Sequence, residues 1–350
     1  MIKKLTKDVS YILLILWGVV TLLFFLFKVL PGDPAHMLVG QRSDKSTVEN
    51  IKRDLGLDLP LWQQYFLYLN DLSPLSIDKK IENQRYDGIT ILNFYQYRFI
   101  FKAPYLRKSY QTKQPVSEML AKAAPASLLL AFASIMLAVL IGIPTGIISA
   151  VKPNSYIDKI SLSISSVGMS LPSYFAAILI GWIFAFILRK YTGLNLTGSL
   201  YEYDLDTKKI ALQNIILPAF TLGTRPISVV MQLTRNSLIT EMKSDYFRTA
   251  RAKGLSVKKA IYRHALPNSL NPVVTALSGW FASMLAGMVF VEYIFAWKGL
   301  GYMLVDALNQ YDFPVVMGCV LFISIFFIII NKLTDWTYKI LDPRIRISTI

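Results

Sequence analysis

Residues Ala124–Ala150 read APASLLLAFASIMLAVLIGIPTGIISA, a run of 27 residues without a charged side chain. A helix needs about 20 apolar residues to cross the hydrocarbon core of a bilayer. The segment therefore predicts a membrane-spanning helix. Gly142 and Gly146 in this run predict close contact with a neighbouring helix, and Pro144 between them predicts a bend.

Five further apolar runs give the chain its organisation. The first begins after Lys3, Lys4 and Lys7; it is too long for a secretory signal, and no cleavage site of small residues follows it. We expect an uncleaved anchor there, and hence an all-α membrane protein with six transmembrane helices. The other five predicted helices lie at Val9–Leu30, Ile160–Leu188, Ile210–Leu233, Pro272–Tyr293 and Pro314–Lys332.

The composition supports this class. Of the 350 residues, 54% are hydrophobic and only 17% are charged, and the mean hydropathy is +0.44. Soluble domains carry about 25% charged residues, so a soluble enzyme and a disordered chain are both disfavoured. The formal net charge of +15 sits on a chain this apolar, and it indicates a membrane surface and no nucleic-acid partner.

The distribution of Lys and Arg predicts the orientation. With the N-terminus inside, the inner segments carry 17 such residues and the short outer loops carry 5. Positive charge collects on the cytoplasmic side of membrane proteins. We therefore expect both termini in the cytoplasm.

Four regions follow from these runs. They are an N-terminal tail with the first helix (1–30), an extracytoplasmic loop region (31–123), a five-helix core (124–335) and a cytoplasmic C-terminal tail (336–350).

Short elements are also predicted in the outer region. One helix would begin at Ser46 or Thr47 and end at Gly56; another would begin near Asp58 and Pro60 and run through Leu69. The second either lies along the outer membrane surface or packs on the helix bundle. Short strands are expected within 88–105.

The core contains a long cytoplasmic loop, residues 234–271. Ser244 is placed to cap a helix over Asp245–Lys253, and Gly254 to end it. Ser256 is placed to cap a second helix that Pro267 would end.

The second helix has an apolar face with basic residues beside it. Such an element either docks into a groove of another protein or lies on anionic lipid. The face consists of Val257, Ala260, Ile261, His264 and Ala265.

No residues are placed for covalent chemistry. The chain lacks a phosphate-binding P-loop motif and an H-E-x-x-H motif, and its two histidines, His36 and His264, lie in different predicted loops. Cys319 is the only cysteine. No carboxylate lies near the centre of a run, as a proton-driven carrier would need; Glu292 is at the end of one. We expect no catalytic residue, no cofactor and no metal.

Arg225 is the exceptional charge, about halfway along its run between Pro218 and Pro226. Facing lipid, it would cost at least ~2.5–3.5 kcal/mol, so it should face protein or water. It either lines a translocation pathway, where it can meet the carboxylate of a passing peptide, or forms a structural ion pair; a shallower placement of the run is the third possibility.

Four stretches together resemble a known family, the permeases of binding-protein-dependent ABC importers. The most specific is 245–255, DYFRTARAKGL, followed by His264, Leu266 and Pro267; it resembles the EAA loop of these permeases. The resemblance is strongest to the first permease of the dipeptide, oligopeptide and nickel branch. The other stretches are LPGDP at 30–34, EYIF with GLG at 292–301, and LDPRIR at 341–346.

The resemblance implies a type I permease fold in the inner membrane of a bacterial cell, and alternating access driven by ATP hydrolysed on other chains. Its partners would be a second homologous permease, two cytoplasmic ATPase subunits and an extracytoplasmic solute-binding protein, with membrane lipid around it. The stretch 74–105 is longer than the corresponding stretch in most permeases of this branch. The residues implied in coupling to the ATPases are Arg248, Thr249, Ala250, Lys253, Gly254, Leu255, His264, Leu266 and Pro267.

Two other functions are consistent with the residues alone. A secondary carrier would need an ion-coupling carboxylate, and a membrane docking protein would use the basic loop without transport. The solute stays open among dipeptides, longer peptides, nickel chelates and other small molecules, and so does the identity of the partner permease.

Overall fold

The computed structural model describes residues 2–29, 58–79, 88–94, 97–204 and 207–341. Its contacts divide the chain into two compact units. Unit 1 comprises Met1–Ala123 and Met303–Ile325, and unit 2 comprises Ala124–Tyr302 and Phe326–Ile350. Three helices, α5 (Val116–Val151), α14 (Leu300–Asn309) and α15 (Phe313–Leu341), have residues in both.

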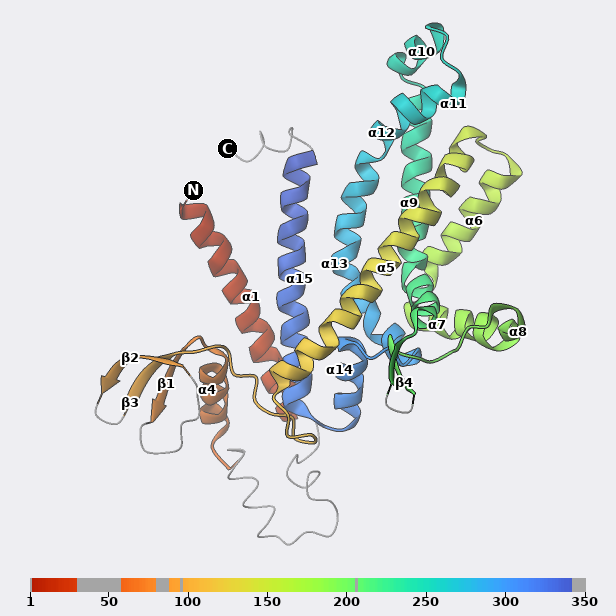
Figure 1. Ribbon diagram of the computed structural model, residues 1–350. Coiled ribbons are helices and arrows are strands. Elements are labelled where there is room, and N and C mark those ends of the chain that lie inside the picture. The colour runs from red at the N-terminus through yellow and green to blue at the C-terminus, as the bar shows by residue number, and fades with distance from the viewer. Residues whose placement is uncertain (1, 30–57, 80–87, 95–96, 205–206, 342–350) are drawn as a thin grey trace. The chain divides into compact units, whose positions relative to one another are not determined.

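Unit 1 is built on α1 (Ile2–Val29), whose apolar part is Ser10–Leu26. The short helix α4 (Leu61–Leu72) packs against it, as Figure 1 shows. The predicted helix after Pro60 is therefore confirmed, and of the two placements left open for it the structure shows packing on the bundle. The expected helix ending at Gly56 lies outside the described residues.

A small antiparallel sheet follows α4. It has the order β1–β3–β2, with β1 at Leu75–Lys79, β2 at Ile89–Phe94 and β3 at Tyr97–Phe101. A bulge between Thr90 and Leu92 shifts the register of β2 against β3. The strands predicted within 88–105 are confirmed, and β1 was not predicted.

Unit 2 holds the longer helices. The pair α6 (Tyr156–Ser170) and α7 (Ser173–Gly181) bends by 116° at the break between them. α7 continues into a π-helical segment, Trp182–Ile187, and α8 (Arg189–Thr192) follows. A hairpin of β4 (Tyr201–Asp204) and β5 (Thr207–Ile210) then leads through a 3-10 turn, Leu212–Ile215, into the next long helix.

That helix is α9 (Ile216–Met242), and α13 (Asn271–Ile294) packs beside it. The run Ile210–Leu233 is thus displaced: its first residues form the strand and the 3-10 turn, and the helix extends nine residues beyond its predicted end. The loop predicted at 234–271 is correspondingly shorter. No glycine or proline occurs within 234–242, so nothing in the local sequence ends the helix at Leu233.

Helix contacts in unit 2 depend on small residues. A Cβ placed on Gly142 would lie 2.9 Å from the carbonyl oxygen of Ile227, and one on Gly146 would lie 2.7 Å from that of Met231. Both clashes are with the backbone of α9, so α5 and α9 approach as closely as glycine permits. The packing role expected for the two glycines is confirmed.

Glu292 closes the turn after α13. Its buried carboxylate accepts hydrogen bonds from Ser127 Oγ and from the backbone N–H groups of Gly301 (2.7 Å) and Tyr302 (3.2 Å). Ser127 Oγ also accepts the N–H of Leu300, at 2.8 Å. One carboxylate therefore satisfies the first N–H groups of α14, which have no partner within the helix.

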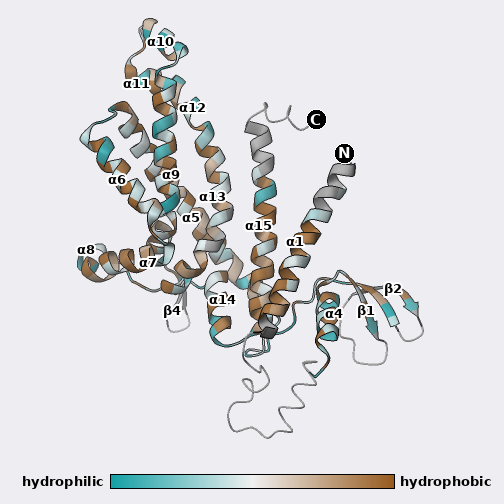
Figure 2. Ribbon diagram, turned by 180° about the vertical axis from the view of Figure 1, so that it is seen from behind, coloured by the Kyte–Doolittle hydropathy of each residue, from teal (hydrophilic) through white to brown (hydrophobic). Residues whose placement is uncertain are grey.

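Three helices in the described residues are long and apolar enough to cross a membrane, and a fourth span is counted if the bent α6–α7 pair is one. The three are Val116–Val151, Leu212–Met242 and Phe313–Thr334, and Figure 2 shows hydrophobic residues along most of α7 and α15. The count of six transmembrane helices stays a prediction.

Candidate functional site

The two short helices of the loop predicted to be cytoplasmic lie at the end of α9, as Figure 1 shows. They are α10 (Asp245–Ala252) and α11 (Val257–Ala260). Ser244 occupies the predicted cap position of α10, but its Oγ donates to the Glu241 carbonyl (2.6 Å) and does not cap the helix. Ser256 caps α11 as expected, because its Oγ accepts the Lys259 N–H.

Gly254 separates the two helices in a left-handed conformation, with φ of +86°. Nothing lies within 4 Å of a Cβ built on it. The requirement for glycine is therefore conformational, because the space around it is open while its φ is one that other residues adopt at a cost. The predicted helix stop is confirmed.

The apolar side of the loop packs on its own protein. Phe247, Ala260, Ile261 and Ala265 are buried in a cluster with residues of α5 and α9, among them Leu238. The apolar face predicted as a docking surface is thus mostly covered by this chain: Val257 alone of its residues is exposed, and His264 is half-buried. Burial of apolar area against the adjacent long helices stabilises this arrangement more than exposure would.

The residues implied in coupling consequently divide into two groups. Ala250 is buried, and Leu255, His264 and Leu266 are half-buried, so they hold the loop in place. The outward surface is polar and basic, and it consists of Arg248, Thr249, Lys253, Gly254 and Pro267.

Polar contacts also fix α10 to its neighbours. The Tyr246 hydroxyl donates to the Glu241 carboxylate of α9, and Asn268 Nδ2 donates to the same hydroxyl at 3.2 Å. Desolvation together with the Glu241 bond raises the pKa of Tyr246 above its ordinary value. Arg251 Nη1 donates to the Leu255 carbonyl across the Gly254 turn, at 2.7 Å.

Pro267 does not end the second helix, contrary to prediction. A π-helical segment, Ile261–Ala265, follows α11, and α12 (Leu266–Ser269) continues with Pro267 in its first turn. Proline is tolerated there because the N–H that it lacks has no partner within that turn. The sequence carried no sign of the π-helical segment that resets the helix before Pro267.

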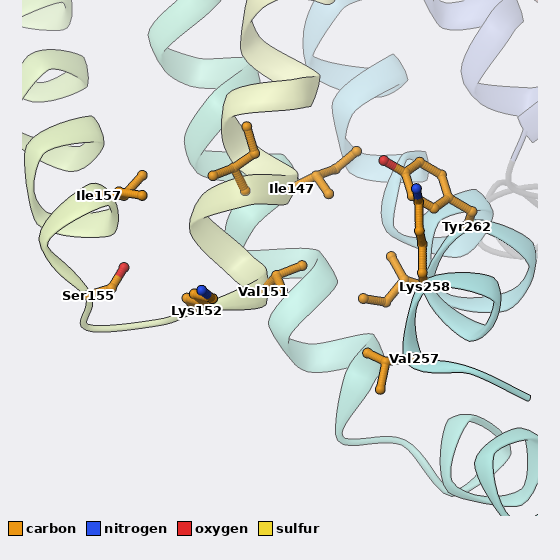
Figure 3. Close-up of a pocket in the computed structure, with 10 residues that line it drawn as sticks. Ile147, Val151, Lys152, Ser155, Ile157, Val257, Lys258 and Tyr262 are labelled. Carbon is orange, nitrogen blue, oxygen red and sulfur yellow. The ribbon is translucent and has the colours of Figure 1, made fainter.

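A pocket of about 480 Å³ lies where α11 approaches the turn between α5 and α6 (Figure 3). Its walls are mostly aliphatic, and Lys152 from the turn and Lys258 from α11 add two ammonium groups. The pocket is therefore an apolar hollow beside α11 that carries positive charge.

An ion pair that the sequence did not reveal lies behind the loop. Arg235 of α9 donates from Nε to Asp158 Oδ1 (2.6 Å) and from Nη2 to Oδ2 (2.7 Å). Ser149 at the end of α5 and the Asn154 N–H bond the same carboxylate. The available signal in the sequence was one acidic residue, Asp158, just before an apolar run, and one basic residue, Arg235, just after another.

Arg225 bonds to the backbone instead of to a carboxylate. Its Nε and Nη2 lie 3.3 and 3.2 Å from the carbonyl oxygen of Leu171, at the break between α6 and α7. The side chain is half-buried and contacts protein through this bond. That its exposed part faces protein or water stays a prediction. The bond satisfies a carbonyl that the bend has removed from the helix.

In the part of the chain that the structure describes, no group of three or more His, Cys, Asp or Glu residues is placed to hold a metal ion. Cys319, the one cysteine of the sequence, is buried. The arrangement consists of a rigid helix pair with a basic outer surface at one end of a bundle of apolar helices.

Comparison with known proteins gives two matching family profiles. Residues 142–347 match the family "Binding-protein-dependent transport system inner membrane component", and residues 1–131 match the N-terminal region of this type of membrane component. Together they cover most of the chain.

Curated relatives match over nearly their full lengths. A dipeptide transport system permease of Alkalihalophilus pseudofirmus is 30% identical over 95% of this chain and 96% of its own. A probable D,D-dipeptide transport system permease of Escherichia coli is 33% identical over 95% and 94%. A glutathione transport system permease of Escherichia coli K12 is 32% identical over 94% of each chain.

A solved structure supports the fold. The MetNI methionine ABC transporter in an inward-facing form matches with a TM-score of 0.50 and 17% identity, over 65% of this chain and 97% of that one. The helical core therefore has the fold of an ABC transporter permease.

Proposed function

The chain belongs to the family of binding-protein-dependent transport system inner membrane components and is an ABC transporter permease; from this premise we propose that peptides are its solutes. Relatives named for dipeptides, D,D-dipeptides and glutathione support this proposal. All three solutes are small and carry peptide bonds and a carboxylate. The membrane protein itself performs no covalent step.

We further propose that α10 and α11 couple the permease to two cytoplasmic ATPase subunits. The observation that carries this proposal is the division of the loop: its apolar residues are anchored on α5 and α9, while Arg248 and Lys253 stay exposed. An element held this firmly moves with the helices behind it. Closure of the ATPases against its outer surface would then reach the membrane helices as rigid-body motion.

The remaining parts of the importer complete the proposal. A second homologous permease would form the pathway with this chain, and a solute-binding protein would deliver peptide from outside. Six transmembrane helices with both termini in the cytoplasm agree with the distribution of Lys and Arg. Arg225 would lie at the pathway, where its remaining N–H groups can meet a peptide carboxylate.

Transport in a reconstituted system tests the function. The chain is placed in proteoliposomes with the permease, ATPases and binding protein encoded beside it, and uptake of a labelled dipeptide is measured. We expect uptake that requires ATP inside the vesicle and is lost when the ATPases are left out. Uptake without ATPases, driven by an ion gradient, would instead identify a secondary carrier.

A charge reversal tests the coupling surface. Arg248→Glu with Lys253→Glu should reduce co-purification of the ATPases by at least tenfold. The matched control is Arg189→Glu with Lys190→Glu, the same charge change on α8 at the other end of unit 2, which should leave co-purification unchanged. Equal yields from both pairs would exclude this surface.

Cysteine labelling tests the orientation. In a Cys319→Ala background, Ser199→Cys should react with an impermeant thiol reagent outside intact cells, and Ser256→Cys only after the membrane is opened. Both native serines lie in loops of unit 2. Labelling of residue 256 from outside would overturn the orientation and the coupling proposal with it.

A further inference from the structure

The sheet of unit 1 exposes its apolar side. Residues opposite one another in an antiparallel sheet share a face, and Leu75 and Ile77 of β1 pair with Phe101 and Phe99 of β3. Phe99 also pairs with Leu92 of β2. All are exposed, by between 39% for Phe99 and 63% for Leu75.

The same face continues to both ends of the strands. Ile89 pairs with Phe101 and is 73% exposed, and Tyr97 of β3 is 44% exposed. Lys79 takes the last register position, opposite Tyr97. We call this surface the aromatic face of the sheet; it consists of Leu75, Ile77, Ile89, Leu92, Tyr97, Phe99 and Phe101.

On the opposite face, Ser76 and Asp78 of β1 and Ile100 of β3 are buried, while Thr90 and Asn93 of β2 are exposed. Asp78 and Arg98 form an ion pair of 2.6 Å, and Ser76 donates from Oγ to the Asn70 carbonyl of α4. Asn70 also exchanges two hydrogen bonds with the backbone of Ile77. β1 thus turns its polar side chains inward and its apolar side chains outward, the reverse of a strand on a soluble domain.

The depth of the sheet follows from α4. Tyr65 and Tyr68 of α4 pack with Val20, Leu23 and Phe24 of α1, in the last third of its apolar stretch. The hydroxyls of Thr21 and Tyr65 lie 2.7 Å apart across this contact.

A helix that contacts α1 there lies at the level where α1 leaves the bilayer. The sheet joins α4 directly through β1 and extends sideways from it in Figure 1. The exposed side chains of α4 at Trp62 and Phe66 belong to the residue types that concentrate at membrane interfaces.

We propose that the aromatic face rests on the bilayer, at the boundary between headgroups and acyl chains of the leaflet where α1 ends. Continuity carries the assignment: lipid-facing α1, the exposed aromatics of α4 and the aromatic face are joined in one chain of contacts. Aromatic and aliphatic side chains favour this boundary. The strand edges can still meet water there, which they could not do deeper in the hydrocarbon.

The proposal gives a role to the segment 74–105, which is longer than the corresponding segment in the permease branch that the sequence resembles. Residues 74–105 contain the whole sheet, and the chain would use them as a second attachment to the membrane surface. A protein partner is the competing occupant. A protein partner would shield the aromatic face from both lipid and water, whereas the bilayer would shield it from water alone. An experiment that measures both contacts therefore distinguishes the two occupants.

Two adjacent positions on β2 provide the test. Leu92 and Asn93 are both exposed but point to opposite faces of the sheet. Leu92→Cys and Asn93→Cys, each in the Cys319→Ala background, are labelled with bimane and placed in vesicles of phosphatidylethanolamine and phosphatidylglycerol. Quenching is measured with a lipid carrying a doxyl group near the headgroup and with aqueous iodide.

The label at residue 92 should be quenched by the doxyl lipid at least threefold more than the label at residue 93, with the reverse order for iodide. Phe99→Cys on the central strand should behave as Leu92→Cys does. Equal access of iodide to both positions would overturn the proposal. Protection of residue 92 from both quenchers in the assembled transporter would assign the face to a protein partner and overturn it as well.

Discussion

Arg235 forms a bidentate ion pair with Asp158: its Nε donates to Oδ1 at 2.6 Å and its Nη2 donates to Oδ2 at 2.7 Å. The pair joins α9 to α6, and Ser149 brings the end of α5 to the same carboxylate. Asp158 is almost completely buried, and Arg235 is only 14% exposed. Three helices, α5, α6 and α9, thus meet at one carboxylate.

Removing one partner of this pair should destabilise the protein strongly. Asp158→Asn leaves Arg235 buried without its counter-charge, and breaking such a pair costs about 3–5 kcal/mol. Thermal unfolding in detergent should show a clear loss of stability. Asp245→Asn is the control, because that carboxylate is fully exposed and its contact with Arg248 is 3.7 Å; a similar loss in both variants would contradict the assigned role.

The Gly254 turn should be required for coupling and not for folding. Gly254→Val forces a β-branched residue into a left-handed conformation that costs about 1–2 kcal/mol, so we expect normal membrane insertion with weaker binding of the ATPases. Gly193→Val is the matched control: its φ is +64°, its surroundings are equally open, and it ends α8. Wild-type co-purification from Gly254→Val would show that the turn is not needed.

Glu292 should stabilise the turn that leads into α14. Glu292→Ala leaves the N–H groups of Gly301 and Tyr302 buried without an acceptor, at about 1–3 kcal/mol. Glu292→Gln keeps an acceptor oxygen and should lose less. Thermal unfolding of the two variants ranks them, and an Ala variant as stable as the Gln variant would mean that these bonds contribute nothing.

Arg225 should affect transport more than assembly. Arg225→Gln removes the charge offered to a peptide carboxylate while its amide can still donate to the Leu171 carbonyl. Peptide uptake should fall several-fold, with the complex and its ATPase activity largely intact. Loss of the assembled complex would assign Arg225 a structural role at the α6–α7 break, and unchanged uptake would exclude the pathway role.

The sequence predicted those parts of the fold that depend on composition and local signals. Long uncharged runs identified α5 and α15, and the glycine at 254 and the serine at 256 marked the loop correctly because each acts on its immediate neighbours. The helix after Pro60 was found for the same reason. The bend between α6 and α7 was missed, because Pro172 was read as part of one continuous apolar run.

Features that depend on distant partners were not predictable in the same way. The bond from Arg225 to Leu171 and the pairing of Arg235 with Asp158 join residues 54 and 77 positions apart. The apolar face of α11 was visible as a pattern, but periodicity does not say what covers a face. Only its packing against Leu238 and its neighbours assigned it to the interior.

The two arginines of α9 secure both ends of α6. Arg225 and Arg235 are ten residues apart, about 15 Å along the helix, and they bond to Leu171 just beyond the end of α6 and to Asp158 near its start. Because these bonds lie at two separate points along α6, this helix can neither slide along α9 nor rotate against it. The α6–α9 pair therefore turns as a single body, and the first joint at which its motion can be redirected is the bend before Ser173.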